Sequence, residues 1–367
     1  MTLLRLAVTT AVALLIVVSA GQAGAQTVLT GDRIDGVALA TRIDDTDLAA
    51  GQSHRFFLRG PETGTGQTWL MPVVVVKGAQ AGPRLLITTG VHGDELNGMA
   101  VVHDLLAEID PSTLRGTLIA VPGVNTPGLT AGTRQLATRG VSGEDLNRVM
   151  PGDALSGDIE RRYAAFFWQG LNVASVDAAI DLHTQSAGIA YGVFVFVDPR
   201  RAGARRIADM LAPDFIKLDL GEPGTVETEL IAAGVDAVTF ELGESRRFQP
   251  DMIARGLRGV RNVMMDLDMM DGTPDLSGPA PFVAPKSTAV RATRGGYARM
   301  RVAIGDDVAV GQTLAVIEGP FGDVVETVTS TIAGRVSVVA TDPITEPGGT
   351  IARILSPSND PACANGC

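Results

Sequence analysis

Two histidines and one glutamate are spaced so that they could share one metal ion. His92 and Glu95 are separated by two residues in the segment TGVHGDELNG, which follows an apolar run and precedes an apolar helical pattern. Side chains with this spacing can converge on one ion at a turn between a strand and a helix. His183 could supply a third ligand, because it ends the apolar run of residues 176–183. Two histidines and one glutamate, with a position left for water, form a common catalytic zinc site, so we predict zinc here.

Three acidic residues could serve such a site. Glu241 lies in the apolar run of residues 237–242, where a carboxylate is unfavourable unless it has a function. A zinc hydrolase needs a base that takes a proton from water and passes it to the leaving amine, and Glu241 is the candidate. Glu244 is the alternative, although we expect it to be a solvated loop residue paired with a neighbouring arginine. Asp181 shares one strand face with His183 and could orient it by a hydrogen bond.

A third segment could bind substrate. EDLNR, residues 144–148, follows a glycine-containing stretch and ends in Arg148. The planar fork of donors on an arginine suits a carboxylate, so the substrate is expected to be anionic.

The elements that must position these residues alternate along the chain. Alternation of buried strands with amphipathic helices predicts an α/β fold, a mostly parallel sheet with helices on both faces. In such sheets, sites form at the carboxyl ends of strands. The predicted strands are residues 72–77, 84–89, 117–121, 176–183, 191–197 and 237–242, and the predicted helices are residues 95–107, 159–171, 201–211, 226–233 and 252–269.

The two ends of the chain differ from this pattern. Residues 1–25 resemble a signal peptide, with one arginine, a 13-residue apolar stretch and an Ala-Gly-Ala cleavage site, so we expect cleavage after Ala25. This predicts a periplasmic or secreted protein without a stable membrane span.

Residues 26–271 would form the catalytic domain, with a short β-rich lead-in, and residues 272–285 a Gly/Pro-rich linker. Residues 286–355, with short strands separated by glycines, predict a small all-β barrel or sandwich. The tail, residues 356–367, contains both cysteines, Cys363 and Cys367; the sequence leaves open whether they form a disulfide.

The amino-acid composition of the chain argues against one class of binding partner. The 367 residues contain 30 Lys+Arg and 41 Asp+Glu, a formal net charge of −11. This acidity argues against nucleic acid, which requires a basic face. The chain contains only four histidines, and two of them, His92 and His183, belong to the candidate metal site.

Four segments carry a resemblance to a known family. GVHGDELNG, EDLNRVMPG, IDLHT and TFELGE, in this order, resemble the succinylglutamate desuccinylase/aspartoacylase family, which is related to the zinc carboxypeptidases. The resemblance covers about residues 70–355. It implies a zinc-carboxypeptidase-like mixed sheet and one zinc ion per chain, with Glu241 as general base and acid. The implied zinc ligands are His92, Glu95 and His183.

The same resemblance implies further site residues. Asn147 and Arg148 would bind a substrate carboxylate. An upstream arginine would polarise the scissile carbonyl; Arg139 fits with an offset of about one residue, and Arg134 is the alternative. The C-terminal domain resembles a biotinyl/lipoyl-like barrel, but its turn EGPFG lacks the acceptor lysine, so neither biotin nor a lipoyl group is expected.

The sequence thus predicts an exported zinc amidohydrolase that cleaves an N-acyl amino acid or a related acylated amine. A metallocarboxypeptidase or amidase acting on peptides, such as cell-wall peptides, would use the same residues. A metal-containing binding protein without catalysis is the third hypothesis, although a binder has no need of Glu241. The sequence specifies neither the acyl group nor the oligomeric state.

Overall fold

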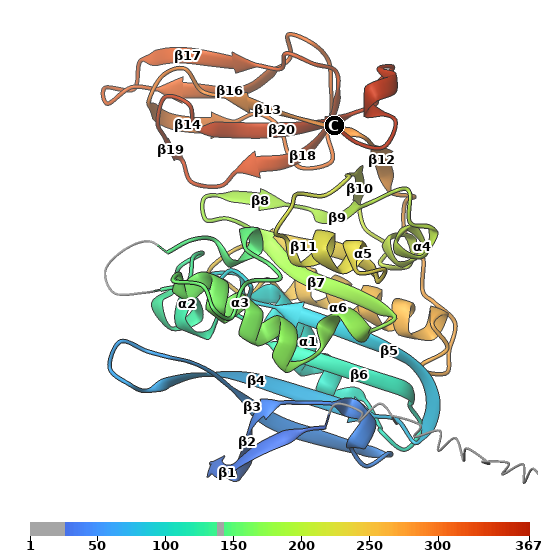
Figure 1. The fold of residues 1–367 in the computed structure, drawn as a ribbon. Coiled ribbons are helices and arrows are strands. Elements are labelled where there is room, and N and C mark those ends of the chain that lie inside the picture. Colours follow the sequence, from blue (N-terminus) through green and yellow to red (C-terminus); the bar gives the residue numbers. More distant parts are fainter. Residues whose placement is uncertain (1–25, 138–142) are drawn as a thin grey trace, which may run out of the picture.

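The computed structural model describes residues 26–137 and 143–367 (Figure 1). The predicted signal peptide, residues 1–25, and Arg139 lie outside the described residues. Within the described ranges, no helix combines the length and the apolar character that crossing a membrane would need.

One eleven-stranded sheet runs through the molecule. Six of its ten neighbouring strand pairs are parallel, which confirms a mixed, mostly parallel sheet. Its strands, in spatial order, are β1 (Val28–Ile34), β2 (Val37–Arg42), β3 (Gln52–Glu62), β4 (Thr68–Lys77), β6 (Arg115–Pro122), β5 (Gln80–Thr89), β7 (Ala178–Gln185), β11 (Asp236–Glu244), β9 (Val193–Val197), β10 (Phe215–Leu218) and β12 (Phe282–Ala284).

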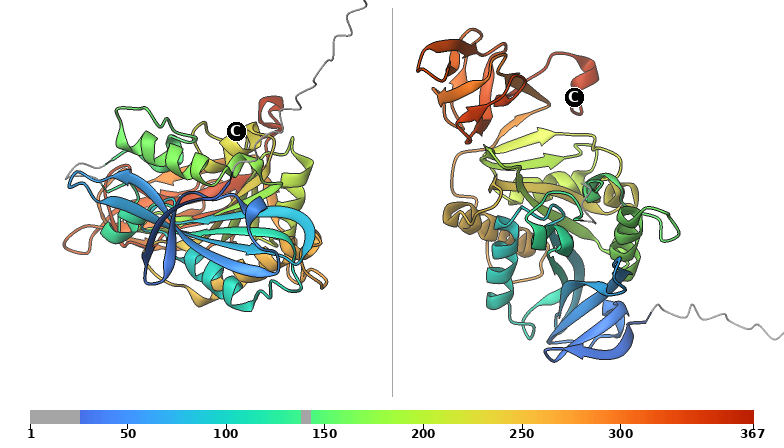
Figure 2. Two further views of the ribbon diagram at one scale, coloured as in Figure 1. Left: turned by 60° about the horizontal axis from the view of Figure 1, so that its bottom comes forward. Right: turned by 90° about the vertical axis from the view of Figure 1, so that its left-hand side faces the viewer.

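Helices cover both faces of this sheet (Figure 2). Successive side chains of a strand point to opposite faces, so each buried strand contributes to two cores. In β5, Leu85 and Ile87 pack in one core and Leu86 in the other. The first core includes α1 (Asn97–Glu108), α4 (Ala202–Met210) and α6 (Pro250–Asp266), and the second includes α3 (Ile159–Gly170) and α5 (Val226–Ala232).

Three differences from the predicted elements affect the site. The first helix begins at Asn97 rather than at residue 95, because Glu95 belongs to the turn that precedes it. The short strand β10 was not predicted. Strand β12 lies inside the stretch treated as a linker, residues 272–285, and pairs in parallel with β10 at the edge of the large sheet.

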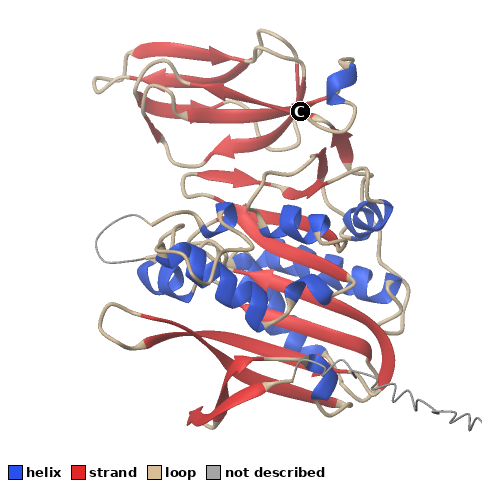
Figure 3. Cartoon of the chain, in the orientation of Figure 1, coloured by secondary structure: helices blue, strands red, loops and turns tan. Residues whose placement is uncertain are grey.

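The C-terminal part consists of strands and contains its own core (Figure 3). Two sheets enclose that core, so the expected small all-β domain is present. Strand β8 (Ile189–Tyr191), which precedes β9 in the chain, pairs with β18 and thereby joins the C-terminal unit. One sheet contains β13 (Lys286–Arg291), β20 (Thr350–Ser356), β18 (Gly334–Ala340), β15 (Asp307–Val308) and β8, and the other contains β17 (Val324–Thr329), β16 (Thr313–Glu318), β14 (Gly296–Met300) and β19 (Ile344–Thr345).

The tail after β20 forms a short helical turn at Pro361–Cys363. Cys363 and Cys367 form a disulfide there, which answers the question that the sequence left open.

Candidate metal centre and cleft

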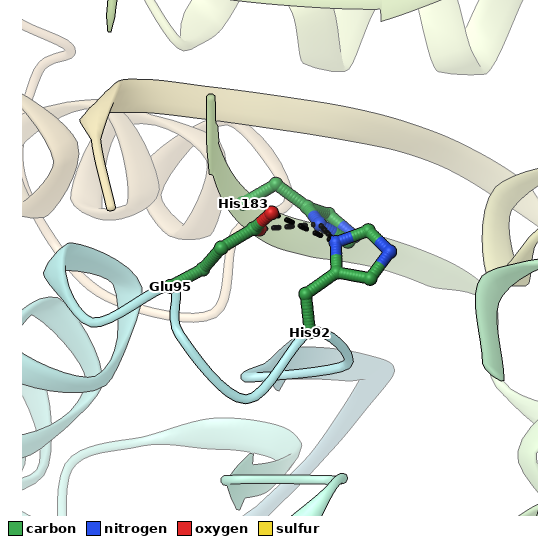
Figure 4. Close-up of side chains that lie close together, drawn as sticks. All are labelled: His92, Glu95 and His183. Carbon is green, nitrogen blue, oxygen red and sulfur yellow. Dashed lines mark hydrogen bonds and ion pairs between the residues drawn. The ribbon is translucent and has the colours of Figure 1, made fainter. Parts of the chain in front are cut away.

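The three predicted metal ligands converge at the carboxyl ends of neighbouring strands (Figure 4). His92 and Glu95 lie on the turn between β5 and α1, and His183 lies in β7, which pairs in parallel with β5. One potential ligand atom from each residue lies within 4.8 Å of the others. All three residues are buried.

Glycines make the turn between β5 and α1 fit its surroundings. A Cβ atom on Gly93 would lie 2.0 Å from the backbone carbonyl carbon of Gly128, which belongs to α2 (Thr126–Ala131). A Cβ atom on Gly98 would lie 2.7 Å from the Cβ of Leu182 in β7. The turn and the start of α1 therefore pack directly against α2 and β7, which fixes where His92 and Glu95 point.

The hydrogen bonds around the two histidines suit a metal ion. The Nδ1 atoms of His92 and His183 lie 3.1 Å apart, and each lies 2.8 Å from a carboxylate oxygen of Glu95. The opposite nitrogens are held by other carboxylates: Nε2 of His183 lies 2.7 Å from Asp181, and Nε2 of His92 lies 3.0 Å from Asp145.

A carboxylate bound to Nε2 favours the tautomer with the proton on that nitrogen, which leaves the Nδ1 lone pair for a metal. The residues present therefore fit a zinc ion by the chemistry of their donor atoms.

The charges within this group act strongly on one another. Burial by itself would raise the pKa of Glu95, but the neighbouring charges of His92 and His183 outweigh it and hold that pKa far below its usual range. Burial would lower the pKa of His183, but Asp181 and Glu95 raise it well above its usual value.

Glu241 lies beside the metal group. It occupies β11, in register with His183 of β7. Its Oε2 atom is out of contact with solvent and has no hydrogen-bond partner within the described part of the chain. Burial raises the pKa of Glu241 to about 8, with the negative charge of Glu95 adding to the effect and the charge of His183 opposing it. Such a carboxyl group can accept and return a proton near neutral pH.

Two arginines, Arg139 and Arg134, were candidates for polarising the scissile carbonyl, and of these Arg134 lies within the described residues. Its NH1 atom lies 3.2 Å from Nδ1 of His92 and 3.4 Å from Oε1 of Glu95. Asp145 holds this guanidinium through Oδ2, 3.1 Å from Nε, while its Oδ1 contacts His92. Sequence reasoning did not single out Asp145; the signal was its place inside the EDLNR segment.

Asn147 and Arg148 line the same cleft as the metal group. They lie in a short helical turn, Leu146–Arg148, whose N-cap is Asp145. Oδ1 of Asn147 accepts a hydrogen bond of 2.8 Å from the backbone N–H of Val226, and Arg148 forms an ion pair of 2.9 Å with Glu222.

Glu244 does not lie where the sequence predicted. It ends β11 and is buried beside Thr341 of the C-terminal unit, so the expectation of a solvated loop residue is wrong, whereas the expected pairing with a neighbouring arginine is confirmed by Arg247. Its Oε1 atom accepts a hydrogen bond of 2.8 Å from Thr341 and lies 3.6 Å from Arg247.

The cleft that contains these residues has a volume of about 280 Å³. Several residues that line this cleft were not predicted from the sequence. Tyr191 of β8 and Arg353 of β20 line it from the C-terminal unit, while Glu227 of α5 and Thr239 of β11 line its interior.

Comparison with known proteins identifies related sequences and folds. A family model described as "Succinylglutamate desuccinylase/Aspartoacylase catalytic domain" matches residues 81–267. An N-alpha-acetyl-L-2,4-diaminobutyric acid deacetylase from Halomonas elongata is 30% identical over 286 residues, which are 73% of this chain and 81% of that protein.

Solved structures share the fold. A succinylglutamate desuccinylase/aspartoacylase from Rhodobacter sphaeroides matches with a TM-score of 0.74 and 25% identity over 86% of this chain and 98% of its own. The product-bound structure of an ectoine utilization protein from Ruegeria pomeroyi matches with a TM-score of 0.75 and 23% identity, over 85% and 98% of the two chains.

Proposed function

Because this chain belongs to the succinylglutamate desuccinylase/aspartoacylase family, we propose that it is a zinc-dependent hydrolase of an N-acyl amino acid or related acylated amine. The observation that carries the proposal is the convergence of His92, Glu95 and His183 beside the unpartnered carboxyl of Glu241.

The side chains divide the work of amide hydrolysis. His92, Glu95 and His183 would hold the zinc ion. The chemistry that this ion would supply when bound is a lower pKa of water and polarisation of the scissile carbonyl. Glu241 takes the proton of the attacking water on its carboxylate and delivers it to the leaving amine nitrogen, so that amine and carboxylic acid separate.

Arginine and asparagine side chains bind and orient the substrate. Arg139, which the family resemblance favours, donates to the oxygen of the reacting carbonyl; Arg134, in the cleft, is the alternative. Asn147 and Arg148 bind a carboxylate of the substrate, for which Arg148 exchanges its ion pair with Glu222.

Glu241→Gln tests this assignment. Metal analysis and hydrolysis of a panel of N-acyl amino acids, including N-acetylated 2,4-diaminobutyric acid, are measured on residues 26–367. We expect full zinc content with activity reduced at least about 100-fold, since the variant lacks the proton acceptor. Near wild-type turnover contradicts the role of Glu241. The control is Glu244→Gln, because Glu244 lies outside the cleft.

The same panel separates the alternative functions. Short peptides assayed beside N-acyl amino acids would be the better substrates of a carboxypeptidase or peptide amidase. Zinc binding with no hydrolysis of any acyl amide would support a binding protein.

Export and the C-terminal unit complete the proposal. Residues 1–25 direct export, so the protein recovered from a periplasmic or culture fraction begins at Gln26, and recovery with Met1 in the cytoplasm contradicts this. The C-terminal unit has a biotinyl/lipoyl-like shape and carries no prosthetic group, and intact-mass measurement checks that expectation.

A further inference from the structure

The cleft contains a second acidic region on the side of α5. Glu227, in the first turn of α5, lines the cleft and is only 5% exposed. Asp219 and Glu222, from the segment between β10 and α5, line the same side.

Glu227 differs from its acidic neighbours because it has an unsatisfied oxygen. Asp219 forms an ion pair of 2.6 Å with Lys217, and Glu222 one of 2.9 Å with Arg148. Oε2 of Glu227 accepts a hydrogen bond of 2.8 Å from the hydroxyl of Thr239, whereas its Oε1 is buried without any hydrogen-bond partner among residues 26–137 and 143–367.

The charges that act most strongly on Glu227 do not compensate for its burial. Burial raises its pKa to about 8, and the hydrogen bond from Thr239 opposes this only in part. The nearby charges that contribute most, Asp219 and Asp181 among them, are negative and raise the pKa further. A buried carboxyl with a free oxygen and acidic neighbours is the expected counterpart of a cationic ligand group.

The hydrogen bond from Thr239 connects Glu227 to β11, the strand that carries Glu241. Its partner Thr239 lies two residues before Glu241 in β11, so both side chains project from the same face of that strand. Their Cα atoms are separated by roughly 7 Å at the rise of a β-strand. The hydrogen bond from Thr239 therefore holds the carboxyl group of Glu227 on this side of β11, in the same cleft as Glu241, so one small substrate can reach both carboxyl groups.

We propose that Glu227 is a specificity residue whose Oε1 accepts a hydrogen bond from an ammonium group on the side chain of the substrate. This inference rests on the proposed hydrolase function and narrows its substrate class to N-acylated diamino acids with a short side chain. Arg148, which lines the same cleft, binds the carboxylate of the same substrate, so the cleft recognises two opposite charges.

The experiment compares two ligands that have the same shape. L-2,4-diaminobutyrate and L-norvaline differ in having an ammonium or a methyl at the end of the side chain. Calorimetry gives their affinities for the zinc-loaded protein, and kcat/KM is measured for their Nα-acetyl derivatives. We expect the cationic member to be favoured about 10- to 100-fold in both measurements, as for a charge-assisted hydrogen bond.

Glu227→Gln assigns that preference to one side chain. The variant keeps an oxygen acceptor for Thr239 but removes the charge, so the cationic-to-neutral ratio should fall to about one, mostly through KM. Glu227→Asp should keep part of the ratio. A purely structural role would change both ligands alike and leave the ratio as in wild type. The control, Glu108→Gln, alters a half-exposed ion pair of α1 with Arg261 and should keep the ratio.

Two results overturn the inference. Equal affinity of the wild-type protein for both ligands would do so without reference to any variant, and so would a wild-type ratio in Glu227→Gln. Failure of the proposed hydrolysis has a different signature, because the calorimetric preference for the cation would persist while neither acetyl derivative is cleaved.

Discussion

At the scale of single residues, the carboxylates behind the histidines matter as much as the ligands themselves. Asp181 accepts from Thr88 through Oδ1 and contacts Nε2 of His183 through Oδ2. This pair of contacts fixes both the orientation and the tautomer of His183.

Asp181→Asn should therefore weaken zinc binding by about 10- to 100-fold. The hydroxyl of Thr88 retains the amide oxygen, so the amide N–H₂ would face Nε2 of His183 and favour the wrong tautomer. Competition with a chelator measures the affinity. Asp209→Asn, which alters a half-exposed ion pair on α4, is the control, and equal affinities in all three proteins would contradict this role.

The buried carboxyl of Glu227 should make stability depend on pH. Its pKa of about 8 in the folded protein lies above the ordinary value of 4.5, so the folded state holds the proton more tightly than the unfolded state. The stabilising contribution is complete below about pH 4.5 and is lost as the pH rises through 8.

Relative to wild type, Glu227→Gln should thus gain up to about 4 kcal/mol in its free energy of unfolding between pH 5 and pH 9. Urea unfolding of the metal-free proteins at both pH values measures this change. A constant difference between the two proteins would show that Glu227 does not titrate in this way.

Sequence reasoning located the metal ligands because they lie in short segments next to recognisable elements. His92 and Glu95 share one turn, and His183 ends an apolar run. Glu227 gave no comparable signal, because an acidic residue in the first turn of a helix is favoured by the helix dipole alone. Its burial and its hydrogen bond from Thr239 arise only in the tertiary structure.

At the scale of elements, the site depends on how closely the turn after β5 approaches α2. Gly93→Ala would place a methyl group 2.0 Å from backbone of Gly128, so the turn must shift. We expect a loss of roughly 2–4 kcal/mol in stability and weaker zinc binding, since His92 and Glu95 move with the turn.

Gly157→Ala is the matched control for this substitution. A Cβ atom at Gly157 meets nothing within 4 Å, so its effect should stay within about 0.5 kcal/mol. Thermal unfolding and metal titration of both variants check the prediction. Equal behaviour of the two would mean that the contact with α2 does not position the ligands.

The central strands were predictable because each is an apolar run buried on two faces. The short strands were not, because β10 and β12 contain four and three residues and a run of that length carries little periodicity. Strand β12 also lies in a Gly/Pro-rich stretch whose composition favours a linker.

At the scale of the whole molecule, the C-terminal unit forms part of the cleft. Strand β8 pairs with β18, Thr341 contacts Glu244, and Arg353 of β20 lines the cleft. The boundaries of an all-β segment were visible in the glycine spacing, whereas its pairing with β8 joins residues about 150 positions apart and depends on strand register that no local pattern encodes.

Arg353→Ala should lower kcat/KM of the proposed hydrolysis by about tenfold, because the cleft loses a cation that can bind an anionic substrate. Steady-state kinetics measure the change. Arg299→Ala, which removes a surface ion pair with Glu318 in the same unit, is the control and should retain wild-type kinetics. Equal kinetics of both variants would exclude a role for Arg353 in the cleft.

The pairing of β8 with β18 also orders events during synthesis. A ribosome completes the residues of the metal group and of α5 well before it reaches β18 and β20. Strand β8 therefore waits with an unpaired edge until the later strands emerge. The wall that carries Arg353 is added last, so the nascent chain acquires its metal ligands early and its finished cleft only near the end of translation.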